Sequence, residues 1–361
     1  TDEQKAKLAE VLAGLEALAG LPDPAGRVLE ARRLDERLEL RRISSPIGLI
    51  ALIFESRPDA LVQMAGLAAK SGNAIVVKGG REAKATNRVL AEVLAKAGTA
   101  AGLPEAWLTA LETREEVDAL LKEDAYVDLV IPRGSKEFVS HIMAVSSIPV
   151  MGHADGICHV YVDDTAEPGM AARIAVDSKA QYPAACNAAE VLLVHSAFAQ
   201  RRFPGGKSGI DILTEALEAA RVQLDFAPPS WAVEYLDLKM AVKVVDSLDE
   251  AIAHVNAWGS GHTDAIVTES PEAAARFLRE VDSASVYHNA STRFADGWRY
   301  GLGAEVGIST GKLHARGPVG LPGLMTYKWV LEGSGQVVAD YSSGARSFLH
   351  EDLPLSGEAE G

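Results

Sequence analysis

Cysteine is scarce in this chain: 361 residues contain two, Cys158 and Cys186. Two cysteines cannot form a disulfide framework, so a reducing, cytoplasmic setting is expected. Long hydrophobic runs are also missing. The most apolar segment, IGLIALIF (47–54), is much shorter than the roughly 20 residues that span a bilayer, and it ends at Glu55. The N-terminal residues 1–20 have a charged helical pattern rather than that of a signal peptide, so no membrane partner is expected.

Basic residues are fewer than acidic ones: the chain has 35 Lys and Arg residues and 50 Asp and Glu residues, so the formal net charge is −15. This balance speaks against nucleic acid or an anionic membrane surface as a partner. The hydrophobic share of 48% and the charged share of 24% are typical of a globular enzyme. An anionic ligand would have to be held by a local cluster of basic side chains and backbone N–H groups. Basic clusters in this chain are therefore informative.

Apolar segments of strand length alternate with amphipathic helical patterns along most of the chain. Strands are predicted at 38–42 (a short edge strand), 46–55, 74–80, 126–132, 190–195, 240–245, 264–269 and 283–289. Helices are predicted at 59–71, 82–98, 113–122, 166–180, 209–220, 248–257 and 271–281. Such alternation with short connections predicts an α/β protein with two doubly wound lobes. The tail from 342 to 361 is polar and is expected to be loose.

Two strand-to-helix junctions carry basic residues next to glycine. VVKGGREAKATN (76–87) leads from a buried strand through two glycines into a basic helix, and DLVIPRGSKEF (128–138) is a second junction of this kind. A glycine turn lets the backbone approach a ligand, and a helix N-terminus attracts anions. Each junction alone is equally compatible with a plain turn or a capped helix. Two of them in an acidic protein favour a phosphate-bearing cofactor, although neither is the G-x-G-x-x-G fingerprint.

Three further loops have the composition of a binding site for an anionic substrate. FESRPDAL (54–61) follows a strand, and ligands of open α/β sheets bind beyond strand ends. NASTRF (289–294) and GISTGKLHARGP (307–318) are dense in Gly, Ser, Thr and Arg. The alternative for the first is a simple strand terminator, and for the other two a surface turn.

Cys186 lies in YPAACNAAEV (182–191), a loop of small residues. Most isolated cysteines are small buried hydrophobes, and Cys158 in GICHVYVD fits that description. Cys186 differs because Gln181 and Asn187 flank a turn whose N–H groups can hold an oxyanion beside a thiolate. From these residues alone, a buried filler remains the favoured interpretation over a nucleophile.

Taken together, these segments resemble the γ-glutamyl phosphate reductases, a branch of the aldehyde dehydrogenase superfamily. The most specific motifs are ESRP, the CNA-x-E cysteine loop, NASTRF and KLHARGP, and the resemblance covers nearly the whole chain. It implies an aldehyde-dehydrogenase-like fold and reduction of L-glutamate 5-phosphate by NADPH to L-glutamate 5-semialdehyde, the second step of proline synthesis from glutamate. An oxidative NAD(P)-dependent aldehyde dehydrogenase is the alternative. Against it, MGHADGICHVY lacks the glutamate base of oxidative members and offers His153 and Asp155 instead.

By position, the resemblance makes Cys186 the nucleophile that forms a thioester, with Asn187 as an oxyanion donor. It implies a cofactor site at Lys78, Gly79, Gly80, Arg81, Lys84, Gly134, Ser135 and Glu234. The candidates for substrate binding are Ser56, Arg57, Asn289, Ser291 and Arg316. No metal is expected. Some positions depart from the family: Tyr182 stands where arginine is usual, Ala184–Ala185 where Gly-Val is usual, and Gly311 where glutamine is usual. The segment 201–233 is also shorter than is typical of the family.

The resemblance also implies a domain organisation. A cofactor-binding domain is expected at 1–33 and 43–157, a catalytic domain at 158–318, and a small β extension for oligomerisation at 34–42 and 326–345. An exposed two-stranded arm is marginal alone, so a homo-oligomer is expected. The same resemblance leaves room for a contact with glutamate 5-kinase, which would supply the acyl phosphate.

Overall fold

The computed structural model describes residues 2–55, 58–153, 155–302 and 304–355. The chain divides into two compact units. Unit 1 comprises Thr1–Pro132, Val145–Val150 and Gly320–Gly361, and unit 2 comprises Arg133–Ala144 and Met151–Val319. Segments 133–144 and 151–157, which the sequence prediction assigns to the cofactor domain, therefore group with the cysteine-bearing unit.

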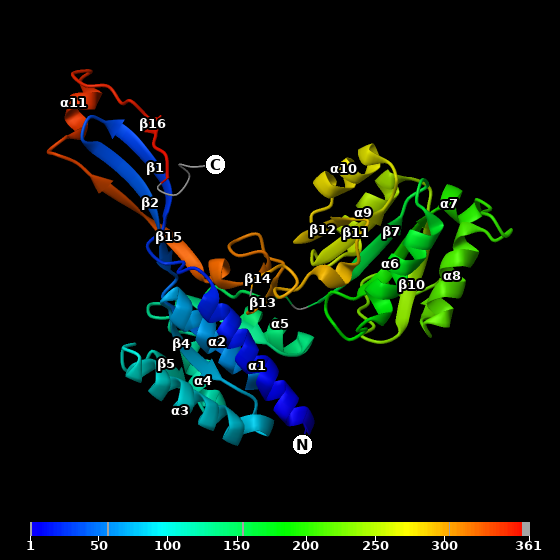
Figure 1. The fold of residues 1–361 in the computed structure, drawn as a ribbon, viewed down its shortest axis with the longest axis horizontal. Coiled ribbons are helices and arrows are strands. Elements are labelled where there is room, and N and C mark those ends of the chain that lie inside the picture. Colours follow the sequence, from blue (N-terminus) through cyan, green and yellow to red (C-terminus); the bar gives the residue numbers. More distant parts are fainter. Residues whose placement is uncertain (1, 56–57, 154, 303, 356–361) are drawn as a thin grey trace. The chain divides into compact units, whose positions relative to one another are not determined.

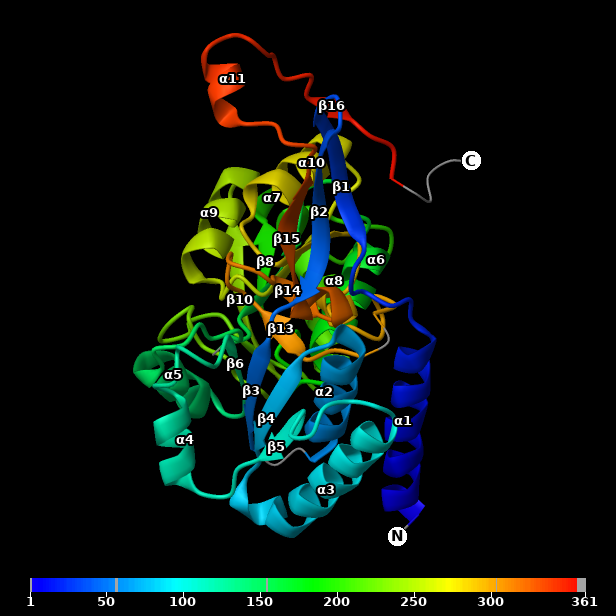
Figure 2. The same cartoon turned by 90° about the vertical axis from the view of Figure 1, so that its left-hand side faces the viewer.

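Unit 1 is built on a four-stranded sheet in the order β5-β4-β3-β6, in which β4 pairs in parallel with both β3 and β5. The strands are β3 (Leu49–Phe54), β4 (Ala74–Lys78), β5 (Leu108–Ala110) and β6 (Leu129–Arg133). The helices are α1 (Asp2–Gly20), α2 (Pro58–Ser71), α3 (Lys84–Ala100) and α4 (Arg114–Leu120), with a 3₁₀ turn η1 at Arg81–Ala83. Helix α2 lies between the sheet and α1 (Figure 2), and the core comes from its apolar face and from the buried strands.

A second, antiparallel sheet of unit 1 forms the extension, in the order β15-β2-β1-β16 (Figure 1). Its strands are β1 (Val28–Asp35), β2 (Leu38–Pro46), β15 (Met325–Glu332) and β16 (Glu351–Asp352). The prediction of an edge strand at 38–42 was wrong, because β2 is longer and pairs on both sides with β1 and β15.

The expected loose tail also packs on the extension as far as residue 355. Phe348 stacks on Tyr341 with ring centroids 4.2 Å apart. Tyr341 lies on the short helix α11 (Val338–Ser342), and β16 pairs with β1. Aromatic stacking and strand pairing therefore order a segment that its polar composition did not predict.

Unit 2 contains a six-stranded parallel sheet in the order β12-β11-β7-β8-β10-β9. The strands are β7 (Cys158–Val162), β8 (Ala189–His195), β9 (Gln223–Asp225), β10 (Lys239–Val245), β11 (Thr263–Val267) and β12 (Ser285–His288). The helices are α5 (Lys136–Val145), α6 (Pro168–Ala180), α7 (Ser196–Gln200), α8 (Gly209–Ala219), α9 (Leu248–Trp258) and α10 (Pro271–Glu280). Two short antiparallel strands follow, β13 (Gly307–Ser309) and β14 (Gly317–Val319).

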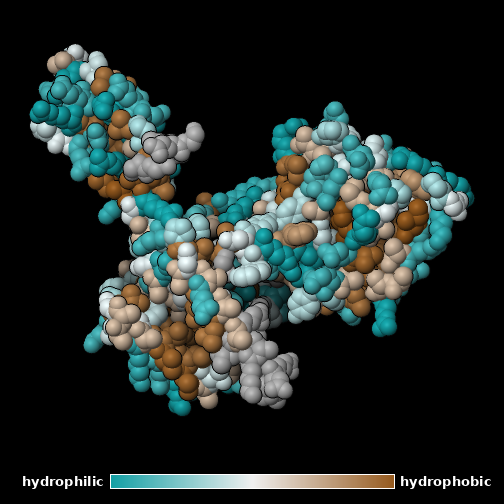
Figure 3. Space-filling model, viewed as in Figure 1, coloured by the Kyte–Doolittle hydropathy of each residue, from teal (hydrophilic) through white to brown (hydrophobic). Residues whose placement is uncertain are grey.

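The central strands of unit 2 are buried on both faces, as expected for a parallel sheet covered by helices. Every residue of β7 and β11 is buried, and so are the first six residues of β8. Because both faces of this sheet are covered, its strands consist mostly of apolar residues. They could therefore be predicted as apolar runs in the sequence, unlike the strands of the extension. On its visible face the extension carries hydrophilic and hydrophobic residues intermixed (Figure 3). No helix in the described part of the chain is long and apolar enough to cross a membrane.

Candidate active site

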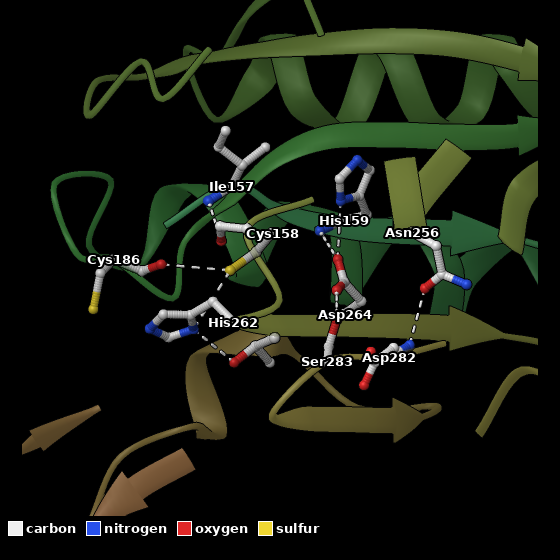
Figure 4. Close-up of polar contacts among 11 residues, drawn as sticks. Ile157, Cys158, His159, Cys186, Asn256, His262, Asp264, Asp282 and Ser283 are labelled. Carbon is white, nitrogen blue, oxygen red and sulfur yellow. Dashed lines mark hydrogen bonds and ion pairs between the residues drawn. The ribbon is translucent and has the colours of Figure 1, made fainter. Parts of the chain in front are cut away.

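Cys186 lies in the turn between α6 and β8, at the ends of the strands where β7, β8 and β11 begin. The turn is closed by backbone hydrogen bonds from Ala185 to Tyr182 and from Ala188 to Ala185. The Cys158 thiol donates to the Cys186 carbonyl at 3.4 Å, so the second cysteine holds the backbone of the loop, and the Cys186 sulfur points away from Cys158 (Figure 4). Cys158 is fully buried and Cys186 is partly exposed. The structure thus separates a structural cysteine from an accessible one.

Gly156 fixes the position of this turn. A Cβ atom at Gly156 would lie 2.1 Å from the Cys186 carbonyl oxygen and 2.7 Å from its Cα, so only glycine permits this approach. The Gly156 N–H also donates to Glu234 Oε1 at 3.0 Å. One residue therefore connects the cysteine loop to Glu234.

A buried ion pair joins the two ends of the cysteine loop. Lys179 in α6 and Glu190 in β8 are fully buried, with Nζ 2.7 Å from Oε2. Burial raises the pKa of Glu190 to about 7, although the Lys179 charge opposes that shift. Glu190 also accepts from the Leu236 N–H at 3.3 Å. The pair therefore anchors the loop and the segment that follows Glu234.

The surroundings of Cys186 favour the neutral thiol. Burial raises the pKa of Cys186 to about 11, and Glu305 and Glu234 add to the rise, whereas Arg133 and Arg293 oppose it. The Arg293 side chain is held by Gln181, whose Oε1 accepts from Nε at 2.9 Å, and it lies over the Tyr182 ring at 5.8 Å. Tyr182, which departs from the family pattern, thus helps to hold an arginine that acts on Cys186.

Two histidines lie beside the thiol. His153, Cys186 and His262 each offer one ligand atom, and these atoms are within 4.8 Å of one another. His153 Nδ1 lies 2.6 Å from the Ile308 carbonyl, and burial lowers the pKa of His153. Burial also lowers the pKa of His262 well below its usual value. Burial therefore favours the neutral form of both imidazoles near pH 7.

Asn187 is buried next to the cysteine. Its Nδ2 donates to the Ala295 carbonyl at 2.7 Å, and its Oδ1 is buried without a hydrogen-bond partner among the described residues. One of the two amide hydrogens is therefore committed to the protein. The role of Asn187 as an oxyanion donor stays a prediction that depends on the other hydrogen.

The aldehyde dehydrogenase family model matches residues 2–214. A γ-glutamyl phosphate reductase from Pelotomaculum thermopropionicum is 54% identical over 355 residues, covering 97% of this chain and 82% of the relative. The chain belongs to the aldehyde dehydrogenase family, in its γ-glutamyl phosphate reductase branch. The crystal structure of the γ-glutamyl phosphate reductase from Thermotoga maritima has a TM-score of 0.87 at 37% identity, covering 92% of this chain and 83% of that one.

A more distant likeness concerns the fold alone. An engineered glycolyl-CoA reductase with bound NADP⁺ has a TM-score of 0.66 at 16% identity, covering 91% of this chain and 88% of that one. The aldehyde-dehydrogenase-like fold predicted from the sequence is confirmed. Membership of the aldehyde dehydrogenase family supports a nicotinamide cofactor.

Five of the predicted cofactor residues lie in unit 1. Lys78 ends β4, Gly79 and Gly80 follow, Arg81 opens η1, and Lys84 opens α3. A Cβ at Gly79 would meet the Asn87 amide at 2.0 Å, so this glycine allows the following helix to pack closely. Helix α3 begins without a side-chain cap and without an acid in its first turn. Arg81 is exposed and Lys84 forms an ion pair with Glu112 at 2.8 Å.

The remaining cofactor residues of the aldehyde dehydrogenase pattern lie in unit 2. Ser135 Oγ accepts from the Phe138 N–H at 3.4 Å, a helix-capping contact, so the capped helix that the sequence left open at this junction is present. Gly134 precedes it, and Lys136 forms an ion pair with Asp155. Burial raises the pKa of Glu234. The cofactor roles of these residues, as of those in unit 1, stay predictions.

The described substrate candidates make hydrogen bonds within the protein. Ser56 and Arg57 lie outside the described residues. Asn289, at a φ of 54°, uses its amide to hold both the N–H and the carbonyl of Thr268, and Ser291 caps the turn at Thr292–Phe294. The Arg316 guanidinium binds the side chain and the carbonyl of Asp282, at 3.1 and 3.0 Å. Arg316 lines a cavity of about 440 Å³. Cys186, Asn289 and Ser291 do not line this cavity.

Sequence reasoning missed several residues at the cysteine. His262, Arg293 and Gly156 were not singled out as functional. Arg133 was noted only as part of a basic junction, and His153 only as a substitute for a missing base. Arg293 lies in NASTRF and Gly156 in HADGICHVYVD, so the motifs contained them. Their closeness to Cys186 depends on the packing of β7, β8 and β11, for which the sequence carries no local signal.

Proposed function

We propose that the chain catalyses the NADPH-dependent reduction of L-glutamate 5-phosphate to L-glutamate 5-semialdehyde, with release of phosphate, through a thioester on Cys186. The supporting observation is a partly exposed cysteine, on a turn braced by Gly156 and Cys158, in a chain 54% identical to a γ-glutamyl phosphate reductase. This activity is the second step of proline biosynthesis from glutamate.

Cys186 has to lose its proton before it can attack the acyl carbon. His153 and His262 are the candidate acceptors, because each has a ring nitrogen close to the sulfur. Burial disfavours the protonated form of both rings, so the bound substrate has to assist this transfer. The thiolate then displaces phosphate, which is a good leaving group, and forms the thioester. The second amide hydrogen of Asn187 supports the developing oxyanion.

Each unit, taken by itself, has groups that fit part of a phosphorylated nicotinamide cofactor. Helix α3 begins without a side-chain cap and without an acidic residue in its first turn, and the exposed Arg81 adds positive charge for a 2′-phosphate. The Glu234 carboxylate, fixed by Gly156, can accept hydrogen bonds from ribose hydroxyls. When bound, NADPH supplies the hydride that reduces the thioester to the aldehyde. The segment 151–161 holds no glutamate that could activate water, and this favours reduction over hydrolysis.

The test uses the reverse reaction, because L-glutamate 5-semialdehyde is more stable than the acyl phosphate. NADP⁺ reduction by the purified chain should require inorganic phosphate, and Cys186→Ala should reduce turnover by at least about 10³-fold while cofactor binding, measured by fluorescence titration, is retained. Cys158→Ser is the matched control and should retain most of the activity, because its hydroxyl can still donate to the Cys186 carbonyl. Phosphate-independent formation of the acid would instead indicate an oxidative aldehyde dehydrogenase, and full activity of Cys186→Ala would exclude the thioester.

A further inference from the structure

The cluster of His153, Cys186 and His262 has the composition of a metal site as well as of a catalytic one. A thiol and two imidazoles are ligands that zinc prefers. Their ligand atoms lie within 4.8 Å of one another. The two rings meet edge to face with centroids 4.9 Å apart, so they approach the same region from different directions.

The hydrogen bonds around the two rings leave one nitrogen of each for a ligand. The Ile308 carbonyl can only accept, so His153 Nδ1 carries the proton of the neutral ring and Nε2 holds the lone pair. His262 Nδ1 lies 2.9 Å from Thr263 Oγ1 and 3.8 Å from Cys158 Sγ, whose own hydrogen is directed at the Cys186 carbonyl. Such contacts at the second ring nitrogen orient metal-binding histidines.

The environment of His262 also indicates a ligand at this cluster. The ring is fully buried, yet its Nε2 has no hydrogen-bond partner among the described residues. Figure 4 shows this nitrogen directed away from Cys158, on the side where the Cys186 sulfur lies. A buried polar atom without a partner costs free energy, and that cost is removed when the atom binds a ligand.

The distances are compatible with a tetrahedral ion after a small adjustment. Zinc–sulfur and zinc–nitrogen bonds of about 2.3 and 2.0 Å separate tetrahedral ligand atoms by about 3.3–3.6 Å. The three atoms, now within 4.8 Å, would have to converge by little more than about 1 Å. The fourth position would remain for water. Glu234 and Glu305 favour a cation near Cys186, and Arg133 and Arg293 oppose it.

We propose that Cys186, His153 and His262 bind a zinc ion reversibly, and that this ion inhibits the enzyme by occupying its nucleophile. On binding, the Cys186 S–H bond breaks, its proton passes to the buffer, and a Zn–S bond forms, with no change in oxidation state. This metal binding can be measured without turnover, so it does not depend on the reaction that the enzyme catalyses. Zinc and the acyl substrate then compete for one sulfur atom.

The first measurement uses cobalt(II) as a spectroscopic probe of the metal-free full chain. One equivalent should produce the thiolate-to-cobalt charge-transfer band and tetrahedral visible bands, and one equivalent of zinc should displace both. His153→Gln and His262→Gln should each weaken zinc binding at least about tenfold in calorimetry, and Cys186→Ala should abolish the charge-transfer band. His141→Gln, at an exposed position of α5, is the matched control and should bind as the wild type does.

Metal binding by His153→Gln and the alkylation of Cys186 test the site even if His262→Gln does not fold. His153 is only partly buried, so His153→Gln tests the site with less risk to the core. Zinc should also protect Cys186 of the wild-type chain from alkylation, and a chelator should restore its reactivity. Zinc binding that Cys186→Ala and His153→Gln leave unchanged, or a cobalt complex without a thiolate band, would overturn the proposal.

Discussion

The reactivity of Cys186 towards alkylation is expected to follow an unusually alkaline pH profile in the free protein. Burial and two nearby carboxylates raise the pKa of Cys186 to about 11, compared with about 8.5 for a free cysteine. At pH 8 the thiolate fraction is then about 0.1%, against about 25% for a free thiol. Because the thiolate is the nucleophile, alkylation at pH 8 should be about 200-fold slower than that of a free cysteine.

The assay is iodoacetamide labelling of the chelator-treated chain from pH 7 to 10.5, with the modified peptide quantified by mass spectrometry. The rate should rise about tenfold per pH unit across most of this range. Arg133→Met should slow labelling at every pH below the plateau, because the Arg133 charge lowers the pKa of Cys186. Cys158, fully buried, should remain unmodified and reports on the integrity of the fold.

A plateau at or below pH 8 would refute this reasoning. It would mean that the free protein already holds a thiolate, most simply as an ion pair with a protonated His153 or His262. The inference that both imidazoles are neutral, which rests on their lowered pKa values, would then be wrong. The proton would have left Cys186 before the substrate binds.

Three further predictions concern structure around the site and the extension. Gly156→Ala should reduce kcat at least about tenfold because its Cβ would strike the Cys186 backbone, whereas Gly14→Ala, where a Cβ meets nothing within 4 Å, should leave kcat unchanged. Glu190→Ala should lower the free energy of unfolding in urea by about 3–5 kcal/mol, because it leaves the Lys179 ammonium buried without its partner; a change below about 1 kcal/mol would contradict this. The chain should form a homo-oligomer, at least a dimer, through the exposed edge strand β15, so Trp329→Lys should shift the mass in light scattering at micromolar concentration towards the monomer; a wild-type monomer would exclude the interface.

Most of the fold was predictable because its signals are local. Every predicted helix is present, with ends that differ by a few residues, as in α2 (Pro58–Ser71) and α10 (Pro271–Glu280). Parallel strands buried on both faces read as apolar runs, and proline and serine mark the helix starts. The short elements α7, α11, β9, β13, β14 and β16 were not predicted, because pieces of two to five residues carry too little periodicity. The eight-residue strand β1 was also missed, because its sequence VLEARRLD has no clear alternation of apolar and polar residues.

The structure of the extension could not be predicted from neighbouring residues in the sequence. The pairing of β2 on both sides and the packing of Phe348 on Tyr341 join segments from opposite ends of the chain. An amphipathic strand looks the same in sequence whether one or both of its edges are paired. The choice between edge and centre is made by residues some 280 positions away, in β15.

The amino-acid sequence alone is enough to predict the alternation of strands and helices, the family, and the small-residue loop around Cys186, since each depends on neighbouring residues. It left that cysteine ambiguous between filler and nucleophile. Only the tertiary structure decided which groups surround the sulfur: the parallel pairing of β7, β8 and β11 brings positions 153, 186 and 262 together. Sheet order is a long-range property set by packing free energy, so the chemistry of the Cys186 thiol, unlike its position in the chain, could not be inferred before the fold was known.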